Sequence, residues 1–317
     1  MTSISDIGGE FSLIRRVTRQ ADDKNVVMSV GDDTAVLEYT EDDYLLFTTD
    51  MMVEGDHFNT GWSTPRQIGV KAMESNVSDI AAMGGRPKYA LISLTLTKDT
   101  SVEFVEQLYD GMYSVCGEYG FNIVGGDTTH GSCVVINVAM IGLVGKRLLR
   151  LRSGARVGDV ICVTGDIGKS KAGLEMLLHG FKGDYAEHTE PKCRLKEAWK
   201  IAEHANAMID VSDGLASEVN HICAASGVGA LVYKSKIPVS DKTREYAGKC
   251  GGDPIDYALN GGEDYELLFT LPKGLICKID VSVPLTVVGE IVDEGEGVMI
   301  VNGGGKKVLK GGFNHFQ

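Results

Sequence analysis

The alternation of apolar and polar residues in the first part of the chain predicts an acidic hairpin, Val26–Phe58. Residues 26–30 and 44–49 are rich in β-branched and aromatic residues and predict buried strands. We expect each strand to end in aspartate, the first at Asp32-Asp33 and the second at Asp50. Carboxylates held at strand ends repel one another, and a hard cation such as Mg²⁺ would compensate them. Asp32 and Asp50 are therefore a candidate functional pair, although an Asp-Asp turn at the surface is the alternative.

Helical periodicity follows the hairpin. Thr64-Pro65 is a typical helix start, and the apolar stripe that begins there ends at Gly84-Gly85. Asn76 and Asp79 lie three residues apart and so share a face of this helix. Asp79 is poorly placed for the helix dipole, so it belongs either to a site or to a solvated face. A capping box opening at Thr100 predicts the next long helix, which continues to Tyr119, and residues 5–24 predict a short one.

Strands and helices alternate in two stretches separated by a basic link near residues 145–154. The pattern predicts an α/β protein (α+β in some classifications) with an N-terminal domain over 1–147 and a C-terminal domain over 148–317. Further strands are predicted at residues 89–96, 121–124, 132–144, 157–165, 207–212, 229–235, 265–271 and 283–292. Further helices are predicted at about 169–179 and 195–205, and a third follows Asp213-Gly214 and continues to Ser226. The polar segments 184–191 and 234–253 are predicted to be loops.

Composition narrows the class of protein. The 317 residues carry a net charge of −13 without a dense Lys/Arg cluster, which argues against nucleic-acid binding. No apolar run is long enough to span a bilayer, and the first residues lack an apolar signal core. The seven cysteines are scattered without any CxxC, which favours core thiols in a reducing, cytoplasmic setting.

Several familiar catalytic motifs are missing. The segment Val163–Ser170 resembles a P-loop, but Val163 stands where the P-loop requires its first glycine. We therefore expect Lys169 to begin a helix rather than to bind phosphate. The chain has no GxSxG, no HExxH and no GxGxxG in a dinucleotide-binding context.

What remains is a set of acids in glycine or hydroxyl settings at the junctions of predicted elements: Asp32, Asp50, Asp79, Asp127, Asp210, Asp213 and Glu263. Their recurrence predicts that they converge on one metal–phosphate centre, because divalent ions neutralise both carboxylates and a polyphosphate. The residues alone thus indicate a Mg²⁺-dependent enzyme acting on a phosphorylated substrate. A non-catalytic acidic cation-binding protein is the alternative.

The order of these motifs resembles that of the thiamine-monophosphate kinase family. The resemblance rests on GDDTAV, TTDMMVEGDHF, NVSDIAAMGG, GGDTT, LRSGARVGD, IDVSDGL, NGGEDYELLF and GFNHF, which span nearly the whole chain. Related ATP-dependent enzymes, namely aminoimidazole-ribonucleotide synthetase, selenophosphate synthetase and a hydrogenase-maturation dehydratase, are alternatives. Selenophosphate synthetases generally have a reactive cysteine near the N-terminus, and the maturation dehydratase ends in a cysteine. This chain has neither.

The resemblance implies ATP-dependent conversion of thiamine monophosphate to thiamine diphosphate by a homodimer that pairs through the mixed sheets of its N-terminal domains. It implies no covalent nucleophile or general base. By motif, the Mg²⁺ ligands would be Asp32, Thr48, Thr49, Asp50, Asp79, Asp127, Asp210 and Asp213. ATP would contact Tyr109, Gly126, Asp127, Arg152 and Ser212, and thiamine monophosphate would contact His57, Glu263 and Phe313.

Some of these assignments have alternatives. Arg150 stands close to Arg152 and could contact phosphate in its place, and Asn314 stands where the family often has Asp. Taken alone, His57 would be a surface or capping residue, whereas Phe313 and Tyr109 would be packing residues.

Overall fold

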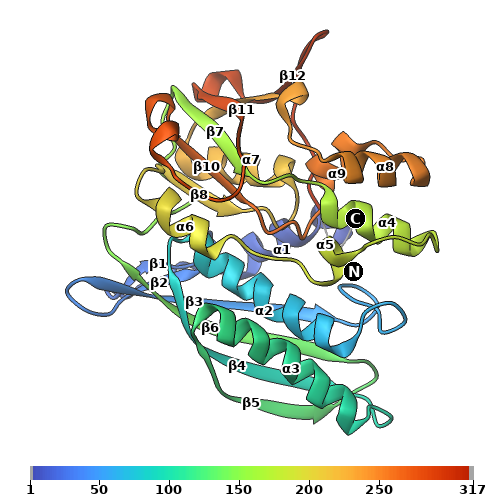
Figure 1. Ribbon diagram of the computed structural model, residues 1–317. Coiled ribbons are helices and arrows are strands. Elements are labelled where there is room, and N and C mark those ends of the chain that lie inside the picture. The colour runs from blue at the N-terminus through green and yellow to red at the C-terminus, as the bar shows by residue number, and fades with distance from the viewer. Residues whose placement is uncertain (1–2, 314–317) are drawn as a thin grey trace.

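The computed structural model describes residues 3–313 and consists of two domains, each built on a mixed sheet with helices (Figure 1). The N-terminal sheet has the strand order β1-β2-β3-β6-β4-β5, in which β4 and β5 run parallel and the other neighbours antiparallel. Its strands are β1 (Val26–Met28), β2 (Ala35–Glu38), β3 (Asp43–Val53), β4 (Arg86–Leu96), β5 (Asn122–His130) and β6 (Val135–Gly145).

Two long helices, α2 (Pro65–Ala82) and α3 (Val102–Tyr119), cover one face of this sheet (Figure 1). They approach so closely that a Cβ on Gly69 would lie 2.0 Å from the carbonyl oxygen of Leu108. Helix α2 starts as predicted, with a complete capping box between Thr64 and Gln67. Almost all of its residues are buried, because α2 also packs against the C-terminal domain. In the sequence, η1 (Ser5–Ile7) and α1 (Glu10–Val17) precede the first strand of the sheet.

The C-terminal sheet has the order β13-β12-β9-β11-β7-β10-β8, in which β9 and β12 run parallel. Its strands are β7 (Asp159–Thr164), β8 (Ala207–Asp210), β9 (Gly229–Tyr233), β10 (Leu267–Pro272), β11 (Leu285–Val292), β12 (Val298–Asn302) and β13 (Gly305–Val308). Its helices are α4 (Lys169–Leu178), α5 (Ala186–Thr189), α6 (Leu195–Ala202), α7 (Leu215–Ser226), α8 (Asp241–Cys250) and α9 (Pro254–Asn260), with 3₁₀ turns η2 (Lys234–Lys236), η3 (Lys273–Lys278) and η4 (Glu294–Glu296).

The structure corrects several predicted elements. The acidic hairpin is a three-stranded meander, because β2 lies between the two predicted strands. Strand β3 continues to Val53, so Asp50 lies within the strand instead of at its end, and β5 likewise continues through the GGDTT motif. The N-cap of α3 is Ser101, whose hydroxyl accepts from the backbone N–H of Phe104, and not Thr100. The segments predicted to be loops contain α5, α8 and η2.

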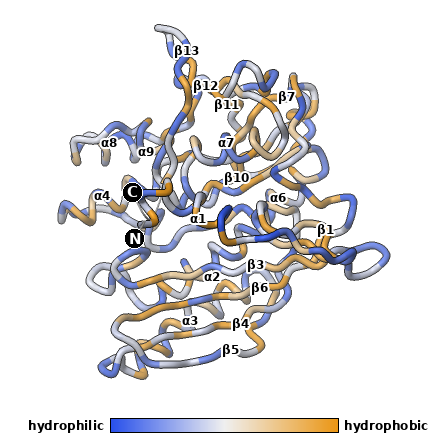
Figure 2. Tube along the Cα trace, turned by 180° about the vertical axis from the view of Figure 1, so that it is seen from behind, coloured by the Kyte–Doolittle hydropathy of each residue, from blue (hydrophilic) through white to orange (hydrophobic). Residues whose placement is uncertain are grey.

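The reverse face of the N-terminal sheet carries no helix among the described residues (Figure 2). Its apolar side chains are exposed: Phe47 (42%), Met51 (55%), Tyr89 (50%) and Leu91 (44%). Cross-strand pairing places them on one surface, which we call the open face. Apolar patches of this kind mark interaction surfaces. No helix in residues 3–313 is both long and apolar enough to cross a membrane.

Candidate active site

Three carboxylates from separate parts of the chain meet where the two domains join. Asp33 follows β1, Asp79 lies in the last turn of α2 and Asp210 ends β8; one oxygen of each lies within 4.8 Å of the others. We call these residues the acidic triad. Two of the three come from the N-terminal domain and one from the C-terminal domain. The site therefore exists only when the domains are packed together.

Hydrogen bonds from hydroxyl groups orient the triad. The hydroxyl of Thr48 in β3 donates to Asp79 at 2.5 Å, and that of Ser78 in α2 donates to Asp210 at 2.6 Å. The guanidinium Nη2 of Arg152 contacts Oδ1 of Asp33 at 2.6 Å, while Oδ2 of Asp33 is buried without a hydrogen-bond partner in the described structure.

Burial makes the charged form of these acids unfavourable. It raises the pKa of Asp79 well above the usual value, and the carboxylates of Asp50 and Asp210 raise it further. Burial likewise raises the pKa of Asp210. A buried set of carboxylates with an unsatisfied oxygen fits a hard divalent cation, which prefers oxygen ligands. The residues present therefore suit Mg²⁺.

Asp32, predicted as a ligand, has a different environment from Asp33. Its carboxylate accepts a hydrogen bond from the backbone N–H of Arg152 at 3.1 Å. Burial, and next the charge of Asp33, raise its pKa to about 7. The structure thus places the second aspartate of the GDD motif in the triad. The sequence contains no signal that distinguishes two adjacent loop aspartates.

The other predicted metal ligands of the N-terminal domain divide between two faces of its sheet, whereas Asp213 follows β8 in the C-terminal domain. Thr48 and Asp50 point toward α2, where the backbone N–H of Asp50 donates to Oδ1 of Asn76 at 3.2 Å. Thr49 lies on the open face, and its hydroxyl donates to Oδ1 of Asn137 at 3.1 Å. Asp127, in the edge strand β5, pairs in register with Ser93 on that same face. The predicted convergence of all the acids on one centre does not occur within a single chain.

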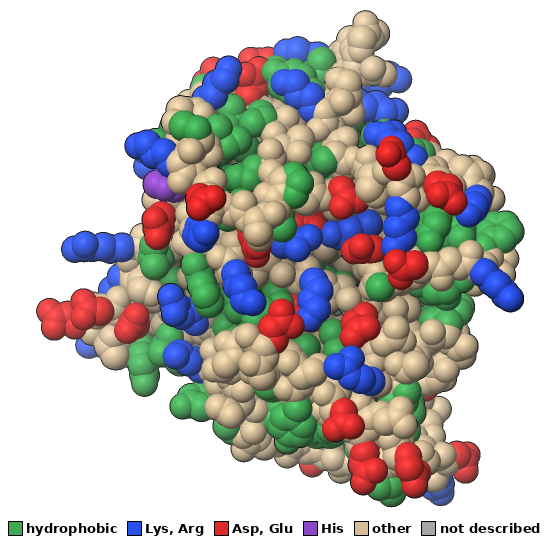
Figure 3. Space-filling view, viewed as in Figure 1, with side chains coloured by type: hydrophobic (Ala, Val, Ile, Leu, Met, Phe, Trp, Pro, Cys, Tyr) green, Lys and Arg blue, Asp and Glu red, His purple; other side chains and the backbone are tan. Residues whose placement is uncertain are grey.

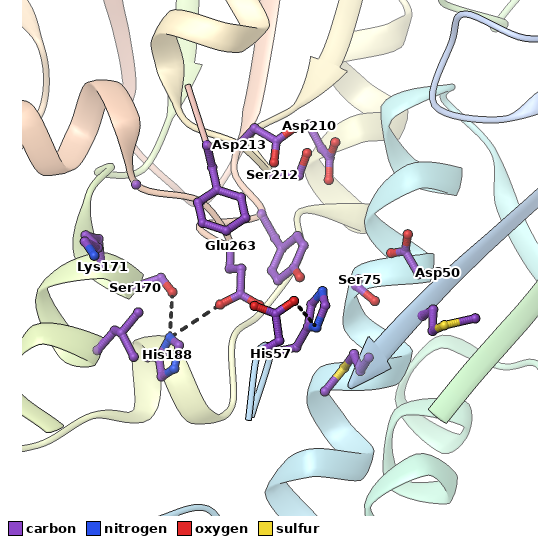
Figure 4. Close-up of a pocket in the computed structure, with 18 of the residues that line it drawn as sticks. Asp50, His57, Ser75, Ser170, Lys171, His188, Asp210, Ser212, Asp213 and Glu263 are labelled. Carbon is purple, nitrogen blue, oxygen red and sulfur yellow. Dashed lines mark hydrogen bonds and ion pairs between the residues drawn. The ribbon is translucent and has the colours of Figure 1, made fainter. Parts of the chain in front are cut away.

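A cavity of about 310 Å³ opens beside the triad, between the two domains (Figure 4). The predicted site residues among those lining it are Asp50, His57, Asp79, Asp210, Ser212, Asp213, Glu263 and Phe313. Phe313 is 44% exposed, and its backbone N–H donates to the carbonyl of Asp213 at 2.9 Å. In Figure 4 a dashed line joins Glu263 to His188, and Asp210, Ser212 and Asp213 are grouped to one side. Basic and acidic side chains also gather across the middle of the molecule, where the domains meet (Figure 3).

The residues predicted to bind ATP are less close together. Tyr109 is a half-buried residue of α3 whose ring centre lies 6.0 Å from that of Tyr113. Only glycine fits at position 126, because a Cβ there would lie 1.8 Å from the carbonyl oxygen of Ile92. Of the two arginines, Arg152 faces the triad, whereas the guanidinium of Arg150 donates to the carbonyls of Arg147 and Leu149. Asn314 lies outside the described residues.

Two further site residues were not predicted from the sequence. Lys71 in α2 is 2% exposed and forms an ion pair with Glu263 at 2.7 Å, and His188 lies 3.5 Å from the same carboxylate. Lys71, Ser75 and Asp79 are spaced four residues apart and so share one face of the helix, which was the available signal for the lysine. We find no comparable signal for His188.

Lys169 begins α4, as predicted, and forms ion pairs inside the C-terminal domain. It pairs with the buried carboxylate of Glu266, which Arg194 contacts at 2.5 Å. Asp264 caps the same helix by accepting from the backbone N–H of Ser170 at 3.0 Å. Lys169 therefore has a structural partner. This agrees with the prediction that the segment is not a P-loop, which was based on its glycine spacing.

Two protein-family models match the chain, one in each half. Residues 31–144 match the model of the AIR synthase related protein N-terminal domain, and residues 156–302 match that of the corresponding C-terminal domain. These matches cover most of both sheets.

Individual relatives are similar over the whole chain. The chain is 40% identical over 316 residues to the thiamine-monophosphate kinase of Aquifex aeolicus, covering 97% of this chain and 98% of the relative. It is 34% identical over 324 residues to the thiamine-monophosphate kinase of Escherichia coli K12, with the same coverage of 97% and 98%. A solved structure described as AaThiL complexed with AMPPCP and TMP superimposes with a TM-score of 0.87 at 39% identity, covering 97% of each chain.

Proposed function

Since the chain belongs to the thiamine-monophosphate kinase family, we propose that it transfers the terminal phosphoryl group of ATP directly onto the phosphate of thiamine monophosphate. The protein is an ATP-dependent phosphotransferase that makes thiamine diphosphate. The observation that carries the direct, in-line route is the acidic triad beside a cavity of about 310 Å³. Ser170 and His188 line the cavity with the hydroxyl 3.1 Å from the imidazole, but the proposed route needs no enzyme nucleophile, because the phosphate oxygen of the substrate attacks directly.

The acceptor needs no general base. The second pKa of a phosphate monoester is about 6, so the attacking oxygen is already ionised at neutral pH. Catalysis would then consist of positioning and charge neutralisation. Asp33, Asp79 and Asp210 would hold Mg²⁺, with Asp50 and Asp213 as further ligands at the cavity wall. When bound, Mg²⁺ would neutralise the donor and acceptor phosphates.

The chain's own groups would orient both substrates. Arg152 contacts Asp33 of the triad, whereas Arg150 donates to backbone carbonyls, so Arg152 is the better candidate of the two arginines for contacting ATP phosphate. Ser212 lines the cavity, together with Asp79 and Asp210 of the triad. His57, Glu263 and Phe313, which also line the cavity, would surround the thiamine moiety, where an acidic group and an aromatic ring suit a cationic heterocycle.

We further propose that the functional unit is a homodimer that pairs through the open face. Four exposed apolar side chains support this pairing, because a second copy of the same face would bury them. Thr49 and Asp127 lie on that face, so the interface would place them beside the partner. Tyr109, Gly126 and Asp127 would then contact ATP near the interface.

The cytoplasm is the proposed location. All seven cysteines are free thiols, four of them buried, which suits a reducing compartment.

The decisive experiment measures ADP and thiamine diphosphate formation from thiamine monophosphate and ATP, with Mg²⁺ present and absent. The proposal expects both products in equal amounts, and only with the metal. Product with an amide or selenide substrate instead would identify a different ATP-dependent enzyme of the wider family. Saturable metal binding without nucleotide binding would identify a simple cation binder.

A further inference from the structure

Lys71 lies near the middle of α2, and its side chain is almost entirely buried, at 2% exposure. An ammonium group has three hydrogens to donate, and the structure supplies three acceptors. They are the carbonyl oxygen of His57 at 2.8 Å and the two carboxylate oxygens of Glu263, at 2.7 Å and 2.8 Å. One side chain of the N-terminal domain thus contacts both His57 and Glu263, which come from different domains.

Glu263 occupies a constrained backbone position. Its φ is 65°, in the left-handed region that non-glycine residues rarely adopt. The preceding Gly262 has no room for a side chain, since a Cβ would lie 2.3 Å from the carbonyl oxygen of Ser212. The backbone N–H of Glu263 donates to that carbonyl at 2.8 Å. The surrounding structure therefore holds the carboxylate toward the N-terminal domain.

A further neighbour of Glu263, His188, is not a competing cation. His188 lies 3.5 Å from the carboxylate and 3.1 Å from the hydroxyl of Ser170 (Figure 4). Burial, and next the charge of Lys71, lower the pKa of His188 to about 4, so it is neutral at pH 7. Burial alone would raise the pKa of Glu263, but Lys71 holds it below its usual value. Among the groups around Glu263, Lys71 makes the largest contribution to lowering its pKa, and it also contacts both carboxylate oxygens directly.

We infer that Lys71 is the positioning residue that gives the substrate pocket its preference for a cationic ring, by fixing the carboxylate of Glu263 and the carbonyl of His57. The inference rests on the proposed function, which places thiamine monophosphate in this cavity. The ammonium lies behind the two groups and is itself buried, whereas the side chain of Glu263 is 25% exposed and lines the cavity. The ring of the substrate would meet the carboxylate and not the lysine.

The test compares two ligands on four proteins by isothermal titration calorimetry. The ligands are thiamine monophosphate and deazathiamine monophosphate, which has a neutral ring of nearly the same shape. The proteins are the wild type, Lys71→Met, Lys71→Met/Glu263→Gln and the control Lys192→Met. Lys192 also joins the domains, through Glu74 at 3.0 Å, but does not line the cavity.

The wild type and Lys192→Met should bind the charged ring at least about tenfold more tightly than the neutral one, which is the scale expected for a contact with a charged group. Lys71→Met should lose most of this discrimination, while the Kd for a non-hydrolysable ATP analogue changes less than about twofold. The double variant removes both charges and so keeps the buried site neutral. It should also fail to discriminate, even if Lys71→Met does not fold.

Retained discrimination in either Lys71 variant would overturn the inference. Equal weakening of both ring ligands and of the ATP analogue would also overturn it, because that pattern shows only a structural role. These results are independent of catalysis. A wild type that bound the charged ring selectively but formed no thiamine diphosphate would refute the proposed kinase reaction and leave the role of Lys71 intact.

Discussion

Asp32 and Asp33 are adjacent in sequence, yet their carboxylates have different partners: Asp32 accepts from the backbone N–H of Arg152, and Asp33 contacts the Arg152 guanidinium and joins the acidic triad. The pair therefore offers a matched test of the metal site. Asp33→Asn should abolish the rise in melting temperature that Mg²⁺ causes and lower activity more than about a hundredfold, or nearly 3 kcal/mol. Asp32→Asn keeps an acceptor for the backbone N–H of Arg152, so this variant should retain most of the Mg²⁺-induced shift and most of the activity. Differential scanning fluorimetry with a Mg²⁺ titration measures the shift, and the reverse ranking would remove Asp33 from the site.

Asp79→Asn should separate stability from activity. The amide keeps the shape and can still accept from Thr48, but it removes a buried charge next to Asp50 and Asp210. The metal-free variant should melt at the same or a higher temperature than the wild type, whereas kinase activity should collapse. Mg²⁺–ATP should stabilise the wild type more than the variant. A variant with near-normal activity and the full ligand-induced shift would show that Asp79 is not a ligand.

Phe313→Ala should weaken only the thiamine side of the cavity. We expect KM for thiamine monophosphate to rise about tenfold or more, as for loss of an aromatic contact with a cation, while KM for ATP stays nearly constant. The control is Phe181→Ala, which truncates a phenylalanine of similar exposure, 42% against 44%, away from the cavity. Steady-state kinetics with each substrate varied in turn measures the effect. Equal changes for both substrates would contradict the assignment.

Lys169→Ala should affect folding more than chemistry. The lysine is buried and pairs with Glu266, which keeps Arg194 and the hydroxyl of Thr164 as partners. We expect a loss of about 1–3 kcal/mol in the free energy of unfolding, less than for a pair left without any cation. Activity per folded molecule should stay within about tenfold of the wild type. Urea unfolding and active-site titration separate the two quantities, and a loss beyond about a hundredfold at unchanged stability would reinstate Lys169 as a phosphate ligand.

His188 predicts a pH dependence of stability. Burial lowers its pKa from 6.5 to about 4, so between these values the unfolded chain binds a proton that the folded chain does not. The free energy of unfolding is therefore unaffected by protonation of this histidine above about pH 6.5. It decreases as the pH falls from 6.5 toward 4, by a total of about 3 kcal/mol. Urea unfolding at several pH values should give a shallower slope for His188→Gln than for the wild type in this window. Identical slopes would show that folding does not lower the pKa of the imidazole.

Periodicity was enough to predict the long elements of the fold. Helices α2 and α3 have continuous apolar stripes and strong start signals, and both were predicted nearly to their ends. Helix α8 was missed because it buries only a few residues, such as Tyr246 and Ala247, in a polar segment. Short elements of this kind have too few apolar residues for a periodic pattern to be detected, whereas β3 and β5 were detected but extend beyond their predicted ends.

The site was predicted by residue type but not by direction. The sequence identified Asp79 and Asp210 correctly as members of one cluster. It could not show that Asp50 lies within a strand, or that Thr49 and Asp127 occupy the sheet face opposite to Thr48 and Asp50. Side-chain direction in a strand alternates with every residue, so the strand boundaries had to be known first. The role of Lys71 required the tertiary structure, because its partner Glu263 is 192 residues away.

The burial of α2 has a consequence for sequence length. This helix contacts the sheet, α3 and the C-terminal domain, and its residues Lys71, Ser75, Ser78 and Asp79 all serve the site. Inserting one residue would rotate everything after it by about 100°, moving these side chains into apolar surroundings and apolar ones into the cavity. No exposed side of the helix is available to absorb such a shift. Single substitutions in residues 65–82 can therefore be tolerated, whereas insertions and deletions cannot. Functional variants of this chain should differ in which residues form this helix but not in how many residues it contains.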